Sequence, residues 1–390
     1  MRKIFLTAIA LLSMASASVF GMYGVDTDWI FFLTHGNQFR ARLDQLGFTL
    51  GNDTIKGTFG FDNNAGYGGV YGSLLSPAEV TNKIYYDFNP SISMGLGYTS
   101  SLISVGVGYS VTLGPRVNKY NGKADTKLVQ QAAHTPVLVL NAMDNAFRMA
   151  IPIQVYVLND KTPTGDMSIN VVSVDSQFRY YTGLDMLPQI RLYLRYGGGN
   201  YKNETQTAKI GESFGFDFRL YFGSMVEEVA LQPLVRLAYD GALGNYHANT
   251  RIQAVKAMDG AYSTVSYGGG VWNLQLMTGL GLTANSDIVS LYLEPQLGLQ
   301  VTRKAPTTSP DAGGAGGAPA PASIASDSYG LAYNVYAEIY ITPLKNLEWY
   351  FEASIGNTHS HNTANQNAVV SGKGLEFAGT TGITWYLPAL

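Results

Sequence analysis

Apolar side chains occupy every second position in two neighbouring stretches of this chain, residues 92–98 and 105–113. The apolar positions are Ile92, Met94, Leu96, Tyr98, Val105, Val107, Tyr109, Val111 and Leu113, and only Gly, Ser and Thr stand between them. Successive side chains of a strand point to opposite faces, so the pattern predicts two strands that share one apolar face. The other face cannot build a dry core. This combination favours a transmembrane β-barrel, with lipid outside and water inside.

The N-terminus carries the features of a secretory signal peptide. Met1-Arg2-Lys3 is basic, residues 4–12 are apolar but too short to span a bilayer, and Ala15-Ser16-Ala17 supplies small residues. We expect residues 1–21 to be the signal peptide, with cleavage after residue 17 or 21. Residues 22–390 then form a single outer-membrane barrel. The chain has no Cys, which excludes disulfides and thiolate catalysis. A net charge of −3 predicts no nucleic-acid partner.

The rest of the sequence predicts an all-β fold, an antiparallel up-and-down barrel of about 16 strands (range 14–16). The clearest strands begin near Gln38, Thr54, Lys83, Leu102, Phe147, Ser168, Pro188, Glu212, Glu227, Val271, Ile288, Tyr329, Leu347 and Gly374. Two weaker strands are expected at 27–34 and 136–140, and without them the count is fourteen.

The connections between these strands alternate in length. Tight turns are expected at 51–53, 100–101, 224–225, 286–287 and 343–346, and long polar loops at 62–82, 114–135, 198–211, 241–269, 303–328 and 357–373. Outer-membrane barrels have short periplasmic turns and long extracellular loops, so this parity favours the barrel. The loop 303–328 is rich in Gly, Ala and Pro and is expected to be a disordered surface loop.

Charged residues at the predicted inward positions fall into two groups. A basic wall is expected from Arg148, Arg179, Arg191, Arg195, Arg219 and Arg236, and an acidic wall from Glu294, Glu338, Glu348, Glu352 and Glu376. An apolar core would not take these charges, because an unpaired buried charge is very costly. They either form salt bridges across a plugged lumen or create a transverse field in a wet pore. Arg40 and Arg42 are expected near the acidic wall.

Pairing Leu96 with Val107 also places four glycines together on the inner wall: Gly95, Gly97, Gly106 and Gly108. Glycine inside a strand often marks the close approach of another segment, so we expect an outside loop to fold inward at this patch. The alternative is that glycine simply eases the curvature of the barrel. Aromatic residues at predicted strand ends suit an interfacial girdle: Trp29, Tyr85, Tyr180, Tyr196, Tyr239, Trp272, Trp385 and Tyr386.

The sequence gives little support for catalysis or metal binding. His359 and His361 could form a zinc pair but have no obvious third ligand, and His247 with Asp240 has no matching nucleophile. The glycine runs lack the helix and the Lys-Ser/Thr of a phosphate loop. We therefore expect no enzyme activity, no cofactor and no metal.

Two runs of sequence carry a family resemblance. The stretch from Met22 to Leu43 and the closing run from Phe377 to Trp385 resemble the variable surface proteins (Vsp) of Brachyspira-type spirochaetes, together with the signal peptide and the mature size. The resemblance implies an abundant outer-membrane β-barrel antigen that varies between strains and assembles into a large complex. It implies no catalytic residues. The aromatic pair Trp385-Tyr386 is followed by Leu387-Pro388-Ala389-Leu390, not by the terminal Phe common in bacterial barrels.

Three functions remain open on the sequence. The first is a variable, surface-exposed outer-membrane antigen with a porin-like, charge-lined lumen. The second is a general diffusion porin in which antigenicity is incidental, and the third is a secreted soluble β-sandwich adhesin. The expected location is the cell outer membrane. The expected partners are outer-membrane lipid, host antibodies, further copies in a homo-oligomer or high-mass complex, and small solutes if the pore is open.

Overall fold

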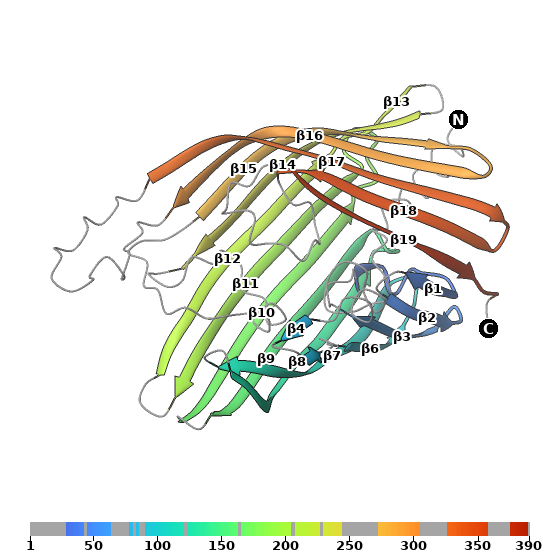
Figure 1. Cartoon of the computed structure of the whole chain (residues 1–390). Helices are drawn as coiled ribbons and strands as arrows, with labels where there is room; N and C mark the ends of the chain where they lie inside the picture. The colour runs from blue at the N-terminus through green and yellow to red at the C-terminus, as the bar shows by residue number, and fades with distance from the viewer. Residues whose placement is uncertain are drawn as a thin grey trace.

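A computed structural model of the chain describes residues 29–42, 45–63, 78–80, 83–85, 90–120, 123–162, 165–203, 207–226, 229–243, 272–304, 326–357 and 375–388. Sixteen antiparallel strands form one closed barrel (Figure 1). They are β1 (Gln38–Arg42), β2 (Gln45–Gly51), β3 (Ile55–Asn63), β6 (Pro90–Tyr98), β7 (Ile103–Tyr120), β8 (Lys123–Ala142), β9 (Phe147–Thr162), β10 (Gly165–Tyr181), β11 (Gln189–Asn203), β12 (Thr207–Tyr221), β14 (Val229–Ala242), β15 (Trp272–Asn285), β16 (Val289–Lys304), β17 (Ser326–Leu344), β18 (Leu347–Gly356) and β19 (Glu376–Tyr386). Three short strands add to these: β13 (Ser224–Val226) pairs with β14, and β4 (Ala78–Val80) pairs with β5 (Lys83–Tyr85).

The barrel closes where the first strand meets the last. β1 pairs with β19 along its whole length, with Phe39 opposite Trp385 and Arg42 opposite Gly382. Beyond these strands, Leu387 N donates to Asn37 O at 2.9 Å. The sheet closes on itself as a barrel, and the one separate sheet among the described residues is the short β4–β5 pair, so the β-sandwich required by the adhesin alternative is wrong.

The two ends of the barrel differ in their connections. One end, here called the turn end, holds the segments 52–54, 99–102, 143–146, 182–188, 286–288 and 345–346. The opposite end, the loop end, holds the connections 43–44, 121–122, 163–164 and 204–206, together with the longest separations between consecutive barrel strands, such as residues 357–375 between β18 and β19. The predicted tight turns are confirmed except at 224–225: Ser224 and Met225 belong to β13, and the chain reverses between Val226 and Val229.

Several predicted boundaries are wrong, for physical reasons. The strand expected at 27–34 is wrong for its described residues, 29–34: residues 29–31 make a single 3-10 turn, η1 (Trp29–Phe31). The strand that starts at Gln38 is followed by a separate strand from Gln45. The loops expected at 114–135 and 198–211 are largely strand, because β7 with β8 and β11 with β12 continue pairing there. Continued pairing satisfies backbone N–H and C=O groups, which explains the longer hairpins. In the region 303–328, residues 303–304 and 326–328 extend β16 and β17, and the residues between lie outside the described ranges.

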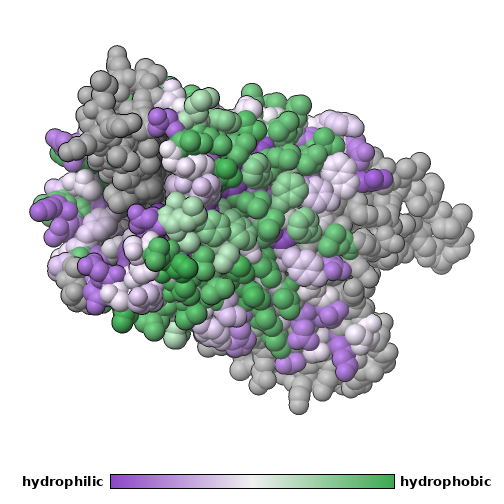
Figure 2. All heavy atoms as spheres, turned by 180° about the vertical axis from the view of Figure 1, so that it is seen from behind, coloured by the Kyte–Doolittle hydropathy of each residue, from purple (hydrophilic) through white to green (hydrophobic). Residues whose placement is uncertain are grey.

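Side chains alternate across the barrel wall as predicted from residues 92–113. Leu96 and Val107 are 60% and 58% exposed, whereas Ser93 and Ser110 are 2% and 0% exposed. The predicted register is confirmed, with Leu96 opposite Val107 and Gly97 opposite Gly106. Hydrophobic side chains gather across the middle of the outer face in Figure 2, and hydrophilic ones lie toward its two ends. Within the described ranges, no helix has the length and apolarity needed to cross a membrane.

Candidate functional site

Five arginines form a single row across the inner wall. Cross-strand pairing places them directly opposite one another on five neighbouring barrel strands, β9, β10, β11, β12 and β14, in the order Arg148, Arg179, Arg191, Arg219 and Arg236. All five are buried. The sixth predicted arginine, Arg195, lies four residues further along β11, toward the loop end. Like charges directly opposite one another repel, so this row requires compensation.

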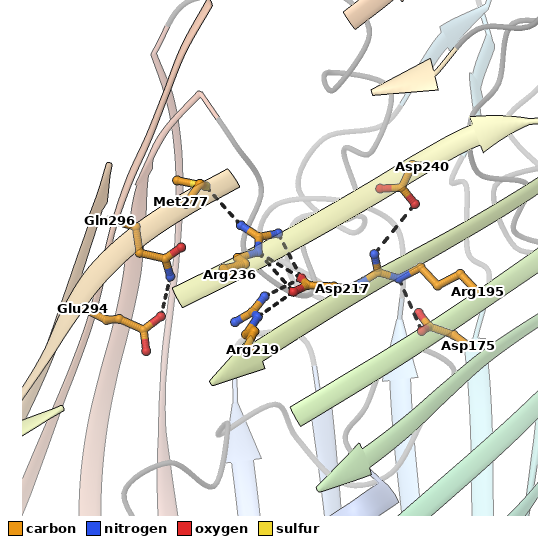
Figure 3. Close-up of polar contacts among 9 residues, drawn as sticks. All are labelled: Asp175, Arg195, Asp217, Arg219, Arg236, Asp240, Met277, Glu294 and Gln296. Carbon is orange, nitrogen blue, oxygen red and sulfur yellow. Dashed lines mark hydrogen bonds and ion pairs between the residues drawn. The ribbon is translucent and has the colours of Figure 1, made fainter. Parts of the chain in front are cut away.

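Asp217 compensates the charge at one end of the row (Figure 3). Arg219 Nε and Nη2 donate to its two carboxylate oxygens at 2.8 and 2.6 Å. Arg236 Nε lies 3.2 and 3.1 Å from the same two oxygens, and its Nη1 lies 3.6 Å from Met277 Sδ. Asp217 is fully buried. Hydrogen bonds from two guanidinium groups stabilise its negative charge there.

Aromatic rings also cover members of the row, including one that Asp217 already binds. The Arg191 guanidinium lies 4.5 Å from the centre of the Tyr221 ring, and Arg219 lies 5.5 Å from that of Tyr193. A guanidinium over a ring face is attracted by the negative quadrupole of the ring. Arg191 Nε also donates to Gln189 Oε1 at 3.0 Å. Part of the positive charge is therefore stabilised without a carboxylate.

A second row crosses the same wall toward the loop end. Arg195 Nε lies 3.4 Å from Asp175 Oδ1, and its Nη1 lies 3.8 Å from Asp240 Oδ1. Asp240 is two strands away, because Gly215 of β12 lies between them in register. A Cβ built on Gly215 would lie 2.1 Å from Asp240 Oδ1. The missing side chain thus leaves the space through which Arg195 reaches Asp240.

Three aspartates were not predicted on the inner wall, although Asp240 was considered as a partner of His247. Asp175, Asp217 and Asp240 share the inward parity of Arg179, Arg219 and Arg236 on their own strands. A search of the inward-facing strand positions for acidic as well as basic residues would have found all three. The basic wall is consequently a mixed wall of six arginines and three aspartates.

The predicted acidic wall lies on the sector formed by β16, β17 and β18. Glu294, Glu338 and Glu352 are buried, and Glu338 lies directly opposite Glu352. Tyrosine hydroxyls donate to these carboxylates: Tyr292 to Glu294, and Tyr336 to both Glu338 and Glu352, the latter at 2.8 Å.

Further hydrogen bonds complete this sector. Tyr340 Oη donates to Glu338 Oε2 at 2.9 Å, and Gln296 Nε2 donates to Glu294 Oε1 at 2.5 Å. Neutral hydroxyl and amide donors stabilise carboxylates without removing their charge. The acidic side chains predicted on this sector are therefore gathered there with tyrosine and glutamine partners.

The remaining predicted acidic residues lie near the barrel seam. Tyr386 Oη donates to Glu348 Oε2 at 3.0 Å. Glu376 begins β19, and its side chain lies outside what the structure describes. On β1, Arg40 donates to Gln38 Oε1, while Arg42 lies 4.2 Å from the centre of the Tyr350 ring. Both arginines are buried beside the acidic sector, as expected.

The four glycines receive the N-terminal segment. A Cβ built on Gly97 would lie 2.4 Å from Leu33 Cδ2, and one built on Gly108 would lie 2.5 Å from the Trp29 ring. Gly95 and Gly106 contact the same segment. The expectation of an outside loop here is wrong, because the occupant is the stretch before β1. Trp29 is 1% exposed, so its assignment to an outer aromatic girdle is also wrong.

Residues 29–35, here called the lumen segment, contact the arginine row on the opposite side. The guanidinium groups of Arg179 and Arg148 lie 4.3 and 5.6 Å from the centre of the Phe31 ring. Arg148 Nη1 donates to Thr34 Oγ1 at 3.3 Å. The segment thus lies between the glycines of β6 and β7 and the arginines of β9 and β10.

His35 ends the lumen segment in a positively charged environment. Its ring stacks on Phe31 with centroids 5.7 Å apart, and its carbonyl oxygen accepts from Lys56 Nζ at 2.5 Å. Burial, assisted by the positive charges of Arg40, Lys56, Arg148 and Arg42, holds the pKa of His35 well below its usual 6.5. The imidazole is therefore neutral in the seated segment at neutral pH.

Within the described ranges, no group of three or more His, Asp or Glu side chains could hold a metal ion. His247, His359 and His361 lie outside those ranges. The geometry supplies charge, aromatic surface and polar lining on the inner wall of a barrel.

A comparison with known families gives a match over nearly the whole chain. A family model described as Serpulina hyodysenteriae variable surface protein matches residues 2–386. No curated protein matches the chain. The family match covers both runs that carry the resemblance in the sequence and nearly all of the chain between and around them.

Proposed function

The chain belongs to the Serpulina hyodysenteriae variable surface protein family, and on that premise we propose that it is a surface-exposed outer-membrane antigen with a porin-like lumen. The observation that carries the proposal is the inverted distribution of polarity. Leu96, Val107 and Leu297 are exposed on the outer wall, whereas Arg219 and Glu338 are buried on the inner wall. Lipid is the solvent that suits such an outer wall, because a closed barrel leaves no unpaired backbone groups facing it.

The membrane assignment is tested by folding the purified mature chain with and without an amphiphile. We expect the barrel to fold in detergent micelles or lipid vesicles, where the unboiled protein migrates differently from the boiled protein on a gel. A stable, monodisperse, folded chain in plain buffer would refute the assignment.

The surface assignment requires intact cells. Exposed polar loops are the parts that antibodies and proteases reach first. We expect protease to cleave within residues 305–325 on intact cells, while a periplasmic marker protein remains whole. Protection of this region until the cells are lysed would contradict surface exposure.

The lumen gives the second part of the proposal. The mixed Arg–Asp wall on β9–β14 faces inward, as does the Tyr–Glu sector on β16–β18, and together they would produce a field across a wet pore. We expect stepwise conductance in planar bilayers containing the refolded protein. Complete absence of conductance, also after removal of the residues that precede β1, would refute the porin-like part and leave the membrane antigen intact.

The alternative function is a diffusion porin in which antigenicity is incidental. Conductance is expected for the antigen with a porin-like lumen and for the diffusion porin alike. Sequence variation among strains distinguishes the two functions. Antigenic selection predicts that loop-end connections differ among strains while the strands do not. A homo-oligomer or high-mass membrane complex and recognition by host antibodies belong to the proposal as expected partners, and native gels and immune sera test them.

A further inference from the structure

We propose that the lumen segment, residues 29–35, is a displaceable plug that closes the barrel at its turn end. The inference rests on the porin-like function proposed above, and it adds the part of the chain that controls passage.

The first observation is a recess shaped for this segment. On β6 and β7, Gly97 lies opposite Gly106 and Gly95 opposite Gly108, so four neighbouring inward positions carry no side chain. Built Cβ atoms there would lie 2.4–3.1 Å from Trp29 or Leu33 side-chain atoms. Any larger residue would displace the segment, which makes the glycines a fitted seat.

The second observation is a local change in the character of the wall. Val137, Val139 and Ala150 on β8 and β9 are buried with the segment in one apolar cluster. The neighbouring inward positions are polar, including Asn141 and Arg148 on the same two strands. Val137, Val139 and Ala150 therefore form an apolar patch that residues 29–33 cover, and burial of this patch stabilises the seated state.

The third observation is that the lumen segment lies at the turn end of the barrel. Gly97 and Gly106 lie beside the turn 99–102, and Arg148 Nε donates at 3.1 Å to Asn145 O in the turn 143–146. Lys56, which donates to His35 O, follows the turn 52–54. The segment is consequently held across the turn end from β3 to β10.

The fourth observation is that the segment is independent of the sheet. None of its residues belongs to a strand, and β1 begins only at Gln38. Backbone hydrogen bonds from Phe32 N to Trp29 O and from Thr34 and His35 N to Phe31 O close the segment on itself. Side-chain contacts seat it, so it can leave while the closing pairs between β1 and β19 remain.

The test uses two independent readouts on the refolded full-length mature protein. A variant with Trp272, Trp349 and Trp385 changed to Phe keeps Trp29 as its sole tryptophan, and acrylamide quenching then reports whether the segment is seated. Planar-bilayer conductance reports whether the lumen is closed.

Two changes unseat the plug. Gly108→Val puts a side chain where the Trp29 ring lies, and deletion of residues 22–35 removes the segment and leaves β1 whole. Gly57→Val on the neighbouring strand β3 is the control, because Gly57 shares the outward parity of Ile55 and Phe59 and a Cβ there meets nothing nearer than 3.9 Å.

We expect weak quenching of Trp29 in the parent and the Gly57→Val control, and quenching several-fold stronger in Gly108→Val. Conductance should rise several-fold in Gly108→Val and in the deletion variant, with heat-modifiable gel mobility unchanged. If Gly108→Val fails to fold, the deletion variant decides the matter.

Two results would overturn the plug while leaving the pore. One is strong quenching of Trp29 in the parent, equal to that in the unfolded chain. The other is equal conductance in the parent and the deletion variant. Silence from every variant, including the deletion, would instead refute the proposed pore and the plug together.

Discussion

Arg219 on β12 lies directly opposite Arg236 on β14, and the two guanidinium groups share the carboxylate of Asp217. The two arginines can lie opposite each other because the charged carboxylate accepts hydrogen bonds from both guanidinium groups. The rest of the row, from Arg148 to Arg191, uses aromatic rings and amide oxygens instead. Asp217 is therefore the residue on which this part of the wall most depends.

Replacing Asp217 with Asn should destabilise the barrel, because it leaves two buried arginines facing each other without a counter-charge. Breaking a buried ion pair typically costs about 3–5 kcal/mol, and we expect a loss in that range. Urea unfolding in lipid vesicles measures it. Asp287→Asn on an exposed turn is the control and should change stability by no more than about 0.5 kcal/mol. Equal stability of the two variants would contradict the shared role.

Gly215→Ala should disrupt the second row, because the new Cβ would lie 2.1 Å from Asp240 Oδ1 and 2.9 Å from Tyr239 O. Overpacking of this kind costs about 1–3 kcal/mol. A double-mutant cycle with Asp240→Ala separates the causes by unfolding measurements. We expect the cost of Gly215→Ala to shrink in the Asp240→Ala background, and an unchanged cost would show that the clash is with the backbone alone.

Acidification should unseat the lumen segment through His35. The pKa of His35 is lowered in the seated state, so the released segment binds a proton more tightly. Seating is therefore fully favourable above the ordinary His pKa of 6.5 and weakens as pH falls below it, by up to about tenfold per pH unit. Trp29 quenching in the single-tryptophan protein should rise between pH 7 and 5. His35→Gln, which cannot titrate, should remove this rise, and an identical rise in both proteins would exclude His35 as its cause.

An arginine at the lipid-facing midpoint of β16 should impair membrane folding. Leu297 is 56% exposed on the outer wall, near the centre of that strand. Arginine at the bilayer midplane of a barrel costs about 2–4 kcal/mol, whereas Leu297→Met keeps the surface apolar. Folding yield and urea midpoints in vesicles compare the variants. If Leu297→Arg matched Leu297→Met, the outer wall would not face hydrocarbon.

The alternation of apolar and polar residues along the strands accounts for most of the correct predictions. It placed Leu96 opposite Val107, set the inward parity of the arginines and identified the glycine patch. It is local information, because a strand forces successive side chains to opposite faces whatever else surrounds it.

The occupant of the glycine patch could not be read the same way. Residues 29–33 are a continuous apolar run, Trp-Ile-Phe-Phe-Leu, which suits a buried strand as well as a buried turn. The choice depends on contacts with β6, β7 and β10, which are more than 60 residues away. Likewise, β1 and β2 pair as a hairpin, yet the two residues between them in the sequence, Leu-Asp, include no Gly, Pro or Asn to mark a turn.

The seam between β1 and β19 dictates the order of assembly. Because the first strand pairs with the last, the earliest part of the sheet must wait, with one edge open, until β19 is available. A chain that ends before β19 would leave two sheet edges unpaired, and unpaired edges form hydrogen bonds with strands of other molecules. Premature termination should therefore yield aggregated protein instead of a smaller barrel.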